Sequence, residues 1–131
     1  MLDLILKALR GCLCPRAEPV PLKLTATATI SINQMSSILL DKLEEMKDDK
    51  AELYLADSAC KVFKRSDVVN FLNLDETDKI TYVAEEHDCD DAAAELYGKG
   101  VPLLWTNVHA LNWFVDENYK LWFVEPQTDK I

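Results

Sequence analysis

The feature that most constrains the fold is a pair of strand-like segments near the C-terminus. Residues 103–115 and 119–125 are both rich in β-branched and aromatic side chains, and residues 116–118 (Asp-Glu-Asn) are the only turn signal between them. Two such segments joined by so short a turn predict an antiparallel hairpin. If the turn consists of those three residues, His109 lies directly opposite Glu125, with Cβ atoms about 5 Å apart. A carboxylate at that distance can accept a hydrogen bond from an imidazole N–H.

A cysteine stands at the predicted start of the helix that precedes this hairpin. Cys89 opens the helix-like run 90–97, and the positive end of a helix dipole favours the thiolate form of a cysteine. The sequence therefore places a candidate nucleophile, Cys89, before a candidate base, His109, and its orienting acid, Glu125. His87 is an alternative base, but it precedes the helix and has no acid across a strand. The alternative for His109 is a ring that Glu125 satisfies within the sheet, with no chemistry.

Acidic residues surround the cysteine. Carboxylates this close raise the pKa of a thiol and oppose the effect of the helix dipole. One hypothesis is that Ca²⁺ removes this penalty, held by oxygens of Glu85, Asp88, Asp90 and Asp91, with Glu86 beside them. The alternative is that the acidic residues only cap the helix, since Asp90 and Asp91 fall in its first turn.

Three short blocks around these residues resemble a known family. Cys89-Asp90-Asp91, His109-Ala110-Leu111-Asn112 and Glu125-Pro126-Gln127-Thr128 look like the blocks of the C-terminal domain of the Marasmius mushroom agglutinin and its small phage and bacterial relatives. The resemblance implies a papain-like fold and a calcium-activated cysteine protease that acts on a peptide or protein substrate. It also implies a catalytic triad on Cys89, His109 and Glu125. The agglutinin domain differs in its longer Cys-to-His separation and its attached sugar-binding domain.

The rest of the chain predicts an α+β domain over residues 22–131. Residues 22–32 alternate apolar and polar, as in a half-exposed strand, and residues 35–47 follow a helical period with Asn33 or Ser36 as N-cap. A second helix is expected from Ser66, which would cap it, and residues 75–78 are expected to form a solvated acidic turn. The cysteine-bearing helix should pack on an antiparallel sheet that ends in the C-terminal hairpin. Asn112 is expected near the His109 strand, where its amide could polarise a carbonyl or hold the ring.

Residues 1–21 are predicted to form a short helix and a proline-rich connector. Leu2, Ile5, Leu6 and Leu9 have helical spacing, and the run is too short to cross a bilayer. One interpretation is a membrane-surface or partner-docking helix with Cys12 or Cys14 acylated. The other is a helix that packs on the domain or on a second copy of the chain, giving a homo-oligomer.

Charge and cysteine spacing narrow the function classes. A net charge of −9 and a pI near 4.6 argue against a nucleic-acid partner. The four cysteines include no Cys-x-x-Cys pair, which favours a reducing, cytoplasmic setting over a zinc or disulfide framework. Two functions are therefore predicted. The first is a thiol peptidase or related acyl-transfer enzyme; the alternative is a non-catalytic papain-like binding or assembly module, for example of a phage.

Overall fold

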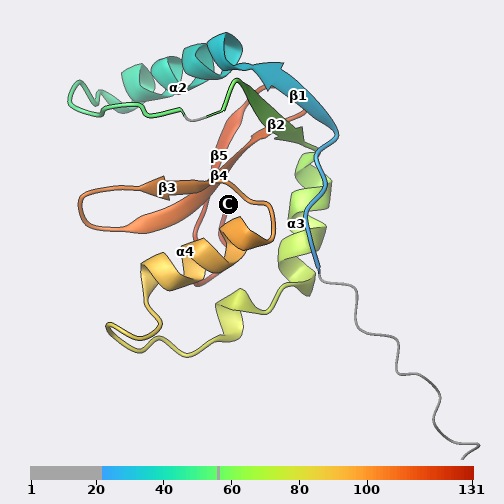
Figure 1. The fold of residues 1–131 in the computed structure, drawn as a ribbon, viewed down its shortest axis with the longest axis vertical. Helices are drawn as coiled ribbons and strands as arrows, with labels where there is room; N and C mark the ends of the chain where they lie inside the picture. Colours follow the sequence, from blue (N-terminus) through green and yellow to red (C-terminus); the bar gives the residue numbers. More distant parts are fainter. Residues whose placement is uncertain (1–21, 56) are drawn as a thin grey trace, which may run out of the picture.

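The computed structural model describes residues 22–55 and 57–131, so the predicted N-terminal helix and connector lie outside the described residues. No helix within the described part is long and apolar enough to span a bilayer. The elements follow one another along the chain as shown in Figure 1. They are β1 (Ala28–Ser31), α2 (Ile32–Met46), β2 (Ala59–Phe63), α3 (Arg65–Leu74), the 3-10 turn η1 (Thr77–Lys79), α4 (Cys89–Gly98), β3 (Leu103–Trp105), β4 (Ala110–Asp116) and β5 (Leu121–Val124).

The sheet is mixed. Its order is β1-β2-β4-β3, and β5 also pairs with β4. All pairs are antiparallel except β2 with β4, which run parallel. The connection from β2 to β4 passes through α3 and α4 and is long enough for a parallel crossover. The α+β class is therefore confirmed, whereas the prediction of a purely antiparallel sheet is wrong, and the papain-like arrangement stays a prediction.

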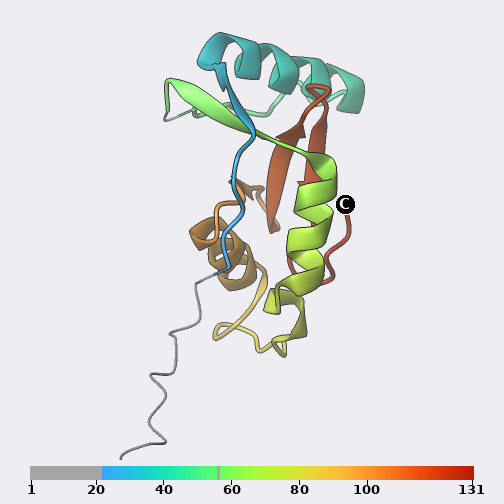
Figure 2. The same cartoon turned by 90° about the vertical axis from the view of Figure 1, so that its right-hand side faces the viewer.

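Helices cover both faces of the sheet. The neighbouring residues Phe114 and Val115 of β4 pack against different helices. Both side chains are fully buried, and neighbouring residues of a strand point to opposite faces. Phe114 packs in a cluster with residues of α3 and α4, such as Val68 and Leu96. Val115 packs with Met35 of α2. Figures 1 and 2 accordingly show the sheet between α2 on one side and α4 on the other.

The helix starts differ from those predicted. A capping box made by Ser31 and Gln34 begins α2, one turn earlier than the sequence suggested. The N-cap of α3 is Lys64, which makes no side-chain cap, so the predicted cap at Ser66 is wrong. The backbone N–H of Arg65 instead donates to the Glu117 carboxylate at 2.8 Å, a partner 52 residues away. That contact exists only in the folded chain.

The predicted strand 103–115 is in fact two strands, β3 and β4. The chain reverses between them at Thr106, whose hydroxyl accepts from the His109 N–H at 2.9 Å and donates to the His109 carbonyl at 2.8 Å. The strands β2 and β3 then share one edge of β4, because β5 takes the other. β2 pairs with Val115 and Asp116, and β3 pairs with Ala110 to Asn112. The sheet therefore forks, with β2 and β3 as its two arms.

The β4–β5 hairpin is confirmed, but its predicted register is wrong. The observed partners are Trp113 with Phe123 and Val115 with Leu121. The three-residue loop is 117–119 rather than 116–118, because the Asp116 N–H bonds to the Lys120 carbonyl at 2.9 Å. Moving a three-residue loop by one residue shifts the pairing by two, so every side chain keeps its predicted face.

The reason for this shift is the carboxylate of Asp116. It is almost fully buried and accepts from the Trp122 indole at 2.7 Å, the Asn118 N–H at 2.8 Å and the Lys120 N–H at 3.0 Å. Burial works to raise the pKa of Asp116, but these donors outweigh it and the pKa is lowered. Asp116 therefore ends the strand and does not open the turn.

The acidic turn at residues 75–78 is not solvated at its first residue. Asp75 is buried, and its carboxylate accepts from the Lys99 ammonium at 2.7 Å and from the Thr77 N–H at 2.9 Å. Lys99 also donates to the Thr77 hydroxyl and to Glu95, each at 2.9 Å. This ion pair ties the start of η1 to the end of α4.

Asp129 gives the first testable prediction. Burial, together with the charges of Asp78 and Asp75, raises its pKa from 3.8 to about 6, and one of its oxygens is buried without a partner. The folded state therefore binds this proton more tightly than the unfolded state, so stability falls as the pH rises from about 4 to about 6. We expect Asp129→Asn to stabilise the protein at pH 7 by about 1–2 kcal/mol, after discounting the shift for solvent screening.

Urea unfolding at pH 7 and near pH 3.5 measures this effect. Asparagine tolerates the positive φ of 55° at position 129. At the lower pH both proteins are neutral at this position, and their stabilities should coincide. A variant that is less stable than the wild type at pH 7 would contradict the prediction.

Candidate functional site

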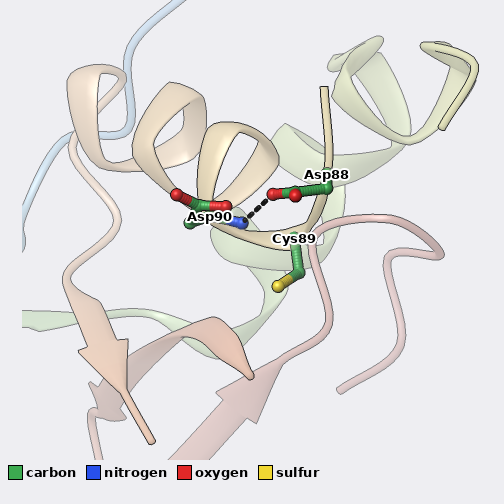
Figure 3. A group of neighbouring side chains, drawn as sticks. All are labelled: Asp88, Cys89 and Asp90. Atoms are coloured by element: carbon green, nitrogen blue, oxygen red, sulfur yellow. Dashed lines mark hydrogen bonds between the residues drawn. The ribbon is translucent and has the colours of Figure 1, made fainter. Parts of the chain in front are cut away.

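The start of α4 carries the predicted nucleophile. Cys89 is the first residue of the helix and is half-buried. Asp88 is the N-cap and accepts from the Asp90 N–H at 3.4 Å, while the Asp88 N–H donates to the Asp91 carboxylate at 3.2 Å. Figure 3 shows the bond between Asp88 and Asp90, with the Cys89 side chain beside it. Asp88 and Asp91 thus form a capping box, and Asp90 and Asp91 lie in the first turn of the helix as predicted.

Part of the predicted calcium site gathers at the same place. Ligand atoms of Asp88, Cys89 and Asp90 lie within 4.8 Å of one another. The neighbouring Asp90 side chain lowers the pKa of Asp88, and the Asp88 side chain raises the pKa of Asp90. Glu85 reaches Asp88 only through its backbone N–H, at 3.4 Å. The helix cap already uses oxygens of Asp88 and Asp91. Calcium binding here stays a prediction.

The predicted base and acid are in contact. His109 Nε2 lies 2.7 Å from Glu125 Oε2, and the two side chains are 32% and 33% exposed. They meet even though the observed register does not place them directly opposite each other. Among the hydrogen bonds of the described residues, none joins the Cys89 sulfur to the His109 ring. The structure thus shows a histidine held by a carboxylate, and the catalytic roles of the three residues stay a prediction.

Asn112 has a different role from either one that the sequence suggested. Its side chain is fully buried, and its amide nitrogen donates to the Ala93 carbonyl at 2.9 Å and to the Val101 carbonyl at 3.2 Å. The first carbonyl belongs to α4 and the second to the segment that leads into β3. Asn112 therefore fastens the helix and the β3 arm to β4, and neither polarises a carbonyl nor holds His109.

A cleft lies between the two arms of the forked sheet, and sequence reasoning missed it. Its volume is about 490 Å³, and it is bounded by the Ala59–Lys61 edge of β2, by the start of β3 and by the C-terminal end of α4. Side chains that line it include Lys23, Tyr54, Asp57, Lys61, Tyr97 and Trp113. They come from segments far apart in the sequence, so no local pattern predicts them. Cys89 is at the opposite end of α4 from Tyr97.

Comparison with known proteins identifies similar folds. No family model matches the chain, and no curated protein matches it. Solved structures that resemble it include PSL1a in complex with E64, with a TM-score of 0.58 and 20% identity over 78% of this chain and 44% of that chain. Another is the Polyporus squamosus lectin bound to the human-type influenza-binding epitope Neu5Acα2-6Galβ1-4GlcNAc, with a TM-score of 0.58 and 21% identity over the same shares.

These comparisons overturn the predicted family and function. The similar structures are of PSL1a and of a glycan-binding lectin, and no family model or curated protein supports the papain-like cysteine protease assignment. The prediction of a thiol peptidase is therefore wrong, and nothing in the comparisons supports the phage assignment. The chain spans less than half the length of the lectin chains that it matches. At this level of identity, the likeness shows a shared fold.

Proposed function

We propose that this chain is a non-catalytic binding module that takes its ligand in the cleft between β2 and β3. The cleft is the observation that carries the proposal. Its volume of about 490 Å³ lies in the range of small-molecule sites. It combines exposed aromatic rings, Tyr54 and Tyr97, with charged groups that can orient a ligand. Such a mixture of apolar walls and a few polar groups is typical of binding sites.

A glycan is the ligand class favoured by the similar structures, because one of them is a lectin with a bound glycan. The rings of Tyr54 and Tyr97 offer flat apolar surfaces, and Asp57 offers acceptors for hydroxyl groups. The match covers 44% of that lectin chain. A glycan is therefore the first ligand class to test on this chain. Titration with Neu5Acα2-6Galβ1-4GlcNAc, followed by backbone amide NMR shifts, tests this class.

We expect any ligand of the module to shift amide signals around Lys61 and Tyr97 and to leave those around His109 unchanged. Tyr97→Ala should abolish the shifts, because it removes an aromatic wall of the cleft. Tyr119→Ala is the matched control, since Tyr119 is equally exposed but lies outside the cleft. Shifts centred on His109 and Glu125 would contradict the assignment of the binding site.

Thiol labelling tests whether the module is non-catalytic. A peptidyl reagent directed at thiols should react with Cys89 no faster than with other accessible cysteines, because the structure shows no hydrogen bond from its sulfur to His109. His109→Ala should leave the labelling rate of Cys89 unchanged, and added Ca²⁺ should have no effect. Mass spectrometry of the labelled peptides measures each rate. Selective labelling of Cys89 that disappears in His109→Ala would overturn the proposal.

A further inference from the structure

Along one wall of the cleft, part of the edge of β2 has no neighbouring strand within the described residues. On the cleft side, β2 pairs with β4 only through Val62 and Phe63. Within the described part of the chain, Ala59 and Cys60 have no strand partner on that side, because the rest of this edge of β4 pairs with β3. A strand edge of this kind presents backbone donors and acceptors to whatever enters the cleft.

The pairing with β1 shows which backbone groups point into the cleft. The Ile32 N–H donates to the Ser58 carbonyl at 3.1 Å, which makes residues 32 and 58 a hydrogen-bonded antiparallel pair. Hydrogen-bonded and non-hydrogen-bonded pairs alternate along such a ladder. Ala59 and Lys61 therefore belong to non-hydrogen-bonded pairs, and the N–H and C=O of Ala59 and the N–H of Lys61 point away from β1, into the cleft.

The opposite wall contributes an acceptor. The Trp113 N–H donates to the Pro102 carbonyl at 3.0 Å. The returning bond of this antiparallel pair would need an N–H on Pro102, which proline lacks. The Trp113 carbonyl therefore has no donor from β3. Trp113 belongs to β4, so the base of the fork offers an acceptor to the cleft, and the β2 arm offers two donors and an acceptor.

The charges of the cleft indicate the side chains of its occupant. Two lysines, Lys23 and Lys61, line it together with one acidic residue, Asp57, in a chain whose net charge is −9. This is a locally positive site on an acidic protein, and it favours an acidic ligand. The exposed rings of Tyr54 and Tyr97 can cover apolar side chains beside it.

We propose that the cleft binds an extended acidic peptide segment, which adds to the Ala59–Lys61 edge of β2 as a further strand. This inference rests on the proposed function and names the ligand class of the same site. The peptide backbone meets the free groups of Ala59, Lys61 and Trp113. Its acidic side chains meet Lys23 and Lys61. A glycan has hydroxyl groups but lacks the alternating backbone donors and acceptors to which this edge is complementary.

The experiment uses the full chain and the capped peptide Ac-Val-Glu-Val-Glu-Val-NH₂, with binding measured by calorimetry and by amide NMR shifts. A pair of N-methylated peptides is the sharpest control, because only the probe changes. Methyl groups on the residues whose N–H faces β2 should weaken binding at least tenfold, whereas methyl groups on the alternate residues should weaken it clearly less, because they can remove only a bond to the Trp113 carbonyl. The double variant Lys23→Gln/Lys61→Gln should also lose at least tenfold, and Lys42→Gln, outside the cleft, should not.

The outcomes separate the inference from the proposed function. Equal binding of the two N-methylated peptides, or of a Val-Lys-Val-Lys-Val peptide, would overturn strand addition of an acidic segment. If the trisaccharide binds in the cleft and the peptide does not, the inference fails while the binding module stands. If neither probe binds there, both fail. Shifts of the Ala59 and Lys61 amides by the peptide, absent with the methylated form that blocks the β2-facing N–H groups, support the inference.

Discussion

Replacing Lys99 with methionine is expected to lower the free energy of unfolding by about 3 kcal/mol, since removing one partner of a buried ion pair leaves the other charge uncompensated. The Asp75 side chain is 2% exposed and the Lys99 side chain 25%, and their charged atoms are 2.7 Å apart. The Lys99 ammonium also holds Thr77 and Glu95. Its loss therefore loosens the junction between η1 and the end of α4.

The pH dependence of this loss has a defined sign. Burial works to raise the pKa of Asp75, but the hydrogen bonds and charge of Lys99 and the bonds from Thr77 outweigh it and lower the pKa below 3.8. The stabilisation is thus present above the pKa of the unfolded state and is lost as the pH falls through the lower, folded-state value. Urea unfolding should show the full difference between wild type and Lys99→Met at pH 7 and a smaller one at pH 3.

Two further variants make this prediction decisive. The double variant Asp75→Asn/Lys99→Met should recover part of the loss, because no buried charge is left unpaired. Lys42→Met is the matched control: its pair with Glu45 is solvent-exposed at Glu45 and should contribute less than about 1 kcal/mol. If Lys99→Met is no more destabilising than Lys42→Met, the ion pair does not hold the junction.

Asn112→Asp is expected to have an effect at least as large, a loss of about 3 kcal/mol or more at pH 7. The two side chains have the same shape, but a carboxylate would place an oxygen where the amide now donates to the Ala93 and Val101 carbonyls. The site is fully buried, so water cannot relieve the repulsion. Because a protonated carboxyl can donate one hydrogen bond, the loss should shrink as the pH is lowered.

Chemical unfolding at pH 7 and pH 4 measures this effect. Asn112→Ala should lose about 2–3 kcal/mol, from two unmade hydrogen bonds and a small cavity, with little dependence on pH. Asn118→Asp, in the exposed hairpin loop, should change stability by less than about 0.5 kcal/mol. An Asn112→Asp variant as stable as Asn118→Asp would show that Asn112 does not fasten α4 to the sheet.

The structure brings together only part of what the three motif blocks predicted. Each block contains one residue of the predicted triad, and one of the two expected contacts, His109 with Glu125, is present. The contact that a nucleophile requires, from the Cys89 sulfur to the imidazole, is not among the hydrogen bonds of the described residues. Short blocks specify which residues are available, whereas the distance between a helix start and a strand depends on how the whole domain packs.

By itself, the sequence determined the features that depend on neighbours in the chain. The helical period of α2, the position of Cys89 at the start of α4, the β4–β5 hairpin and the faces of its side chains all follow from local spacing. Only the tertiary structure decided the parallel pairing of β2 with β4, the ion pair of the buried Asp75 with Lys99, the end of β4 at Asp116 and the cleft at the fork. These features join residues that are distant along the chain or depend on desolvation, and neither is encoded in a local pattern.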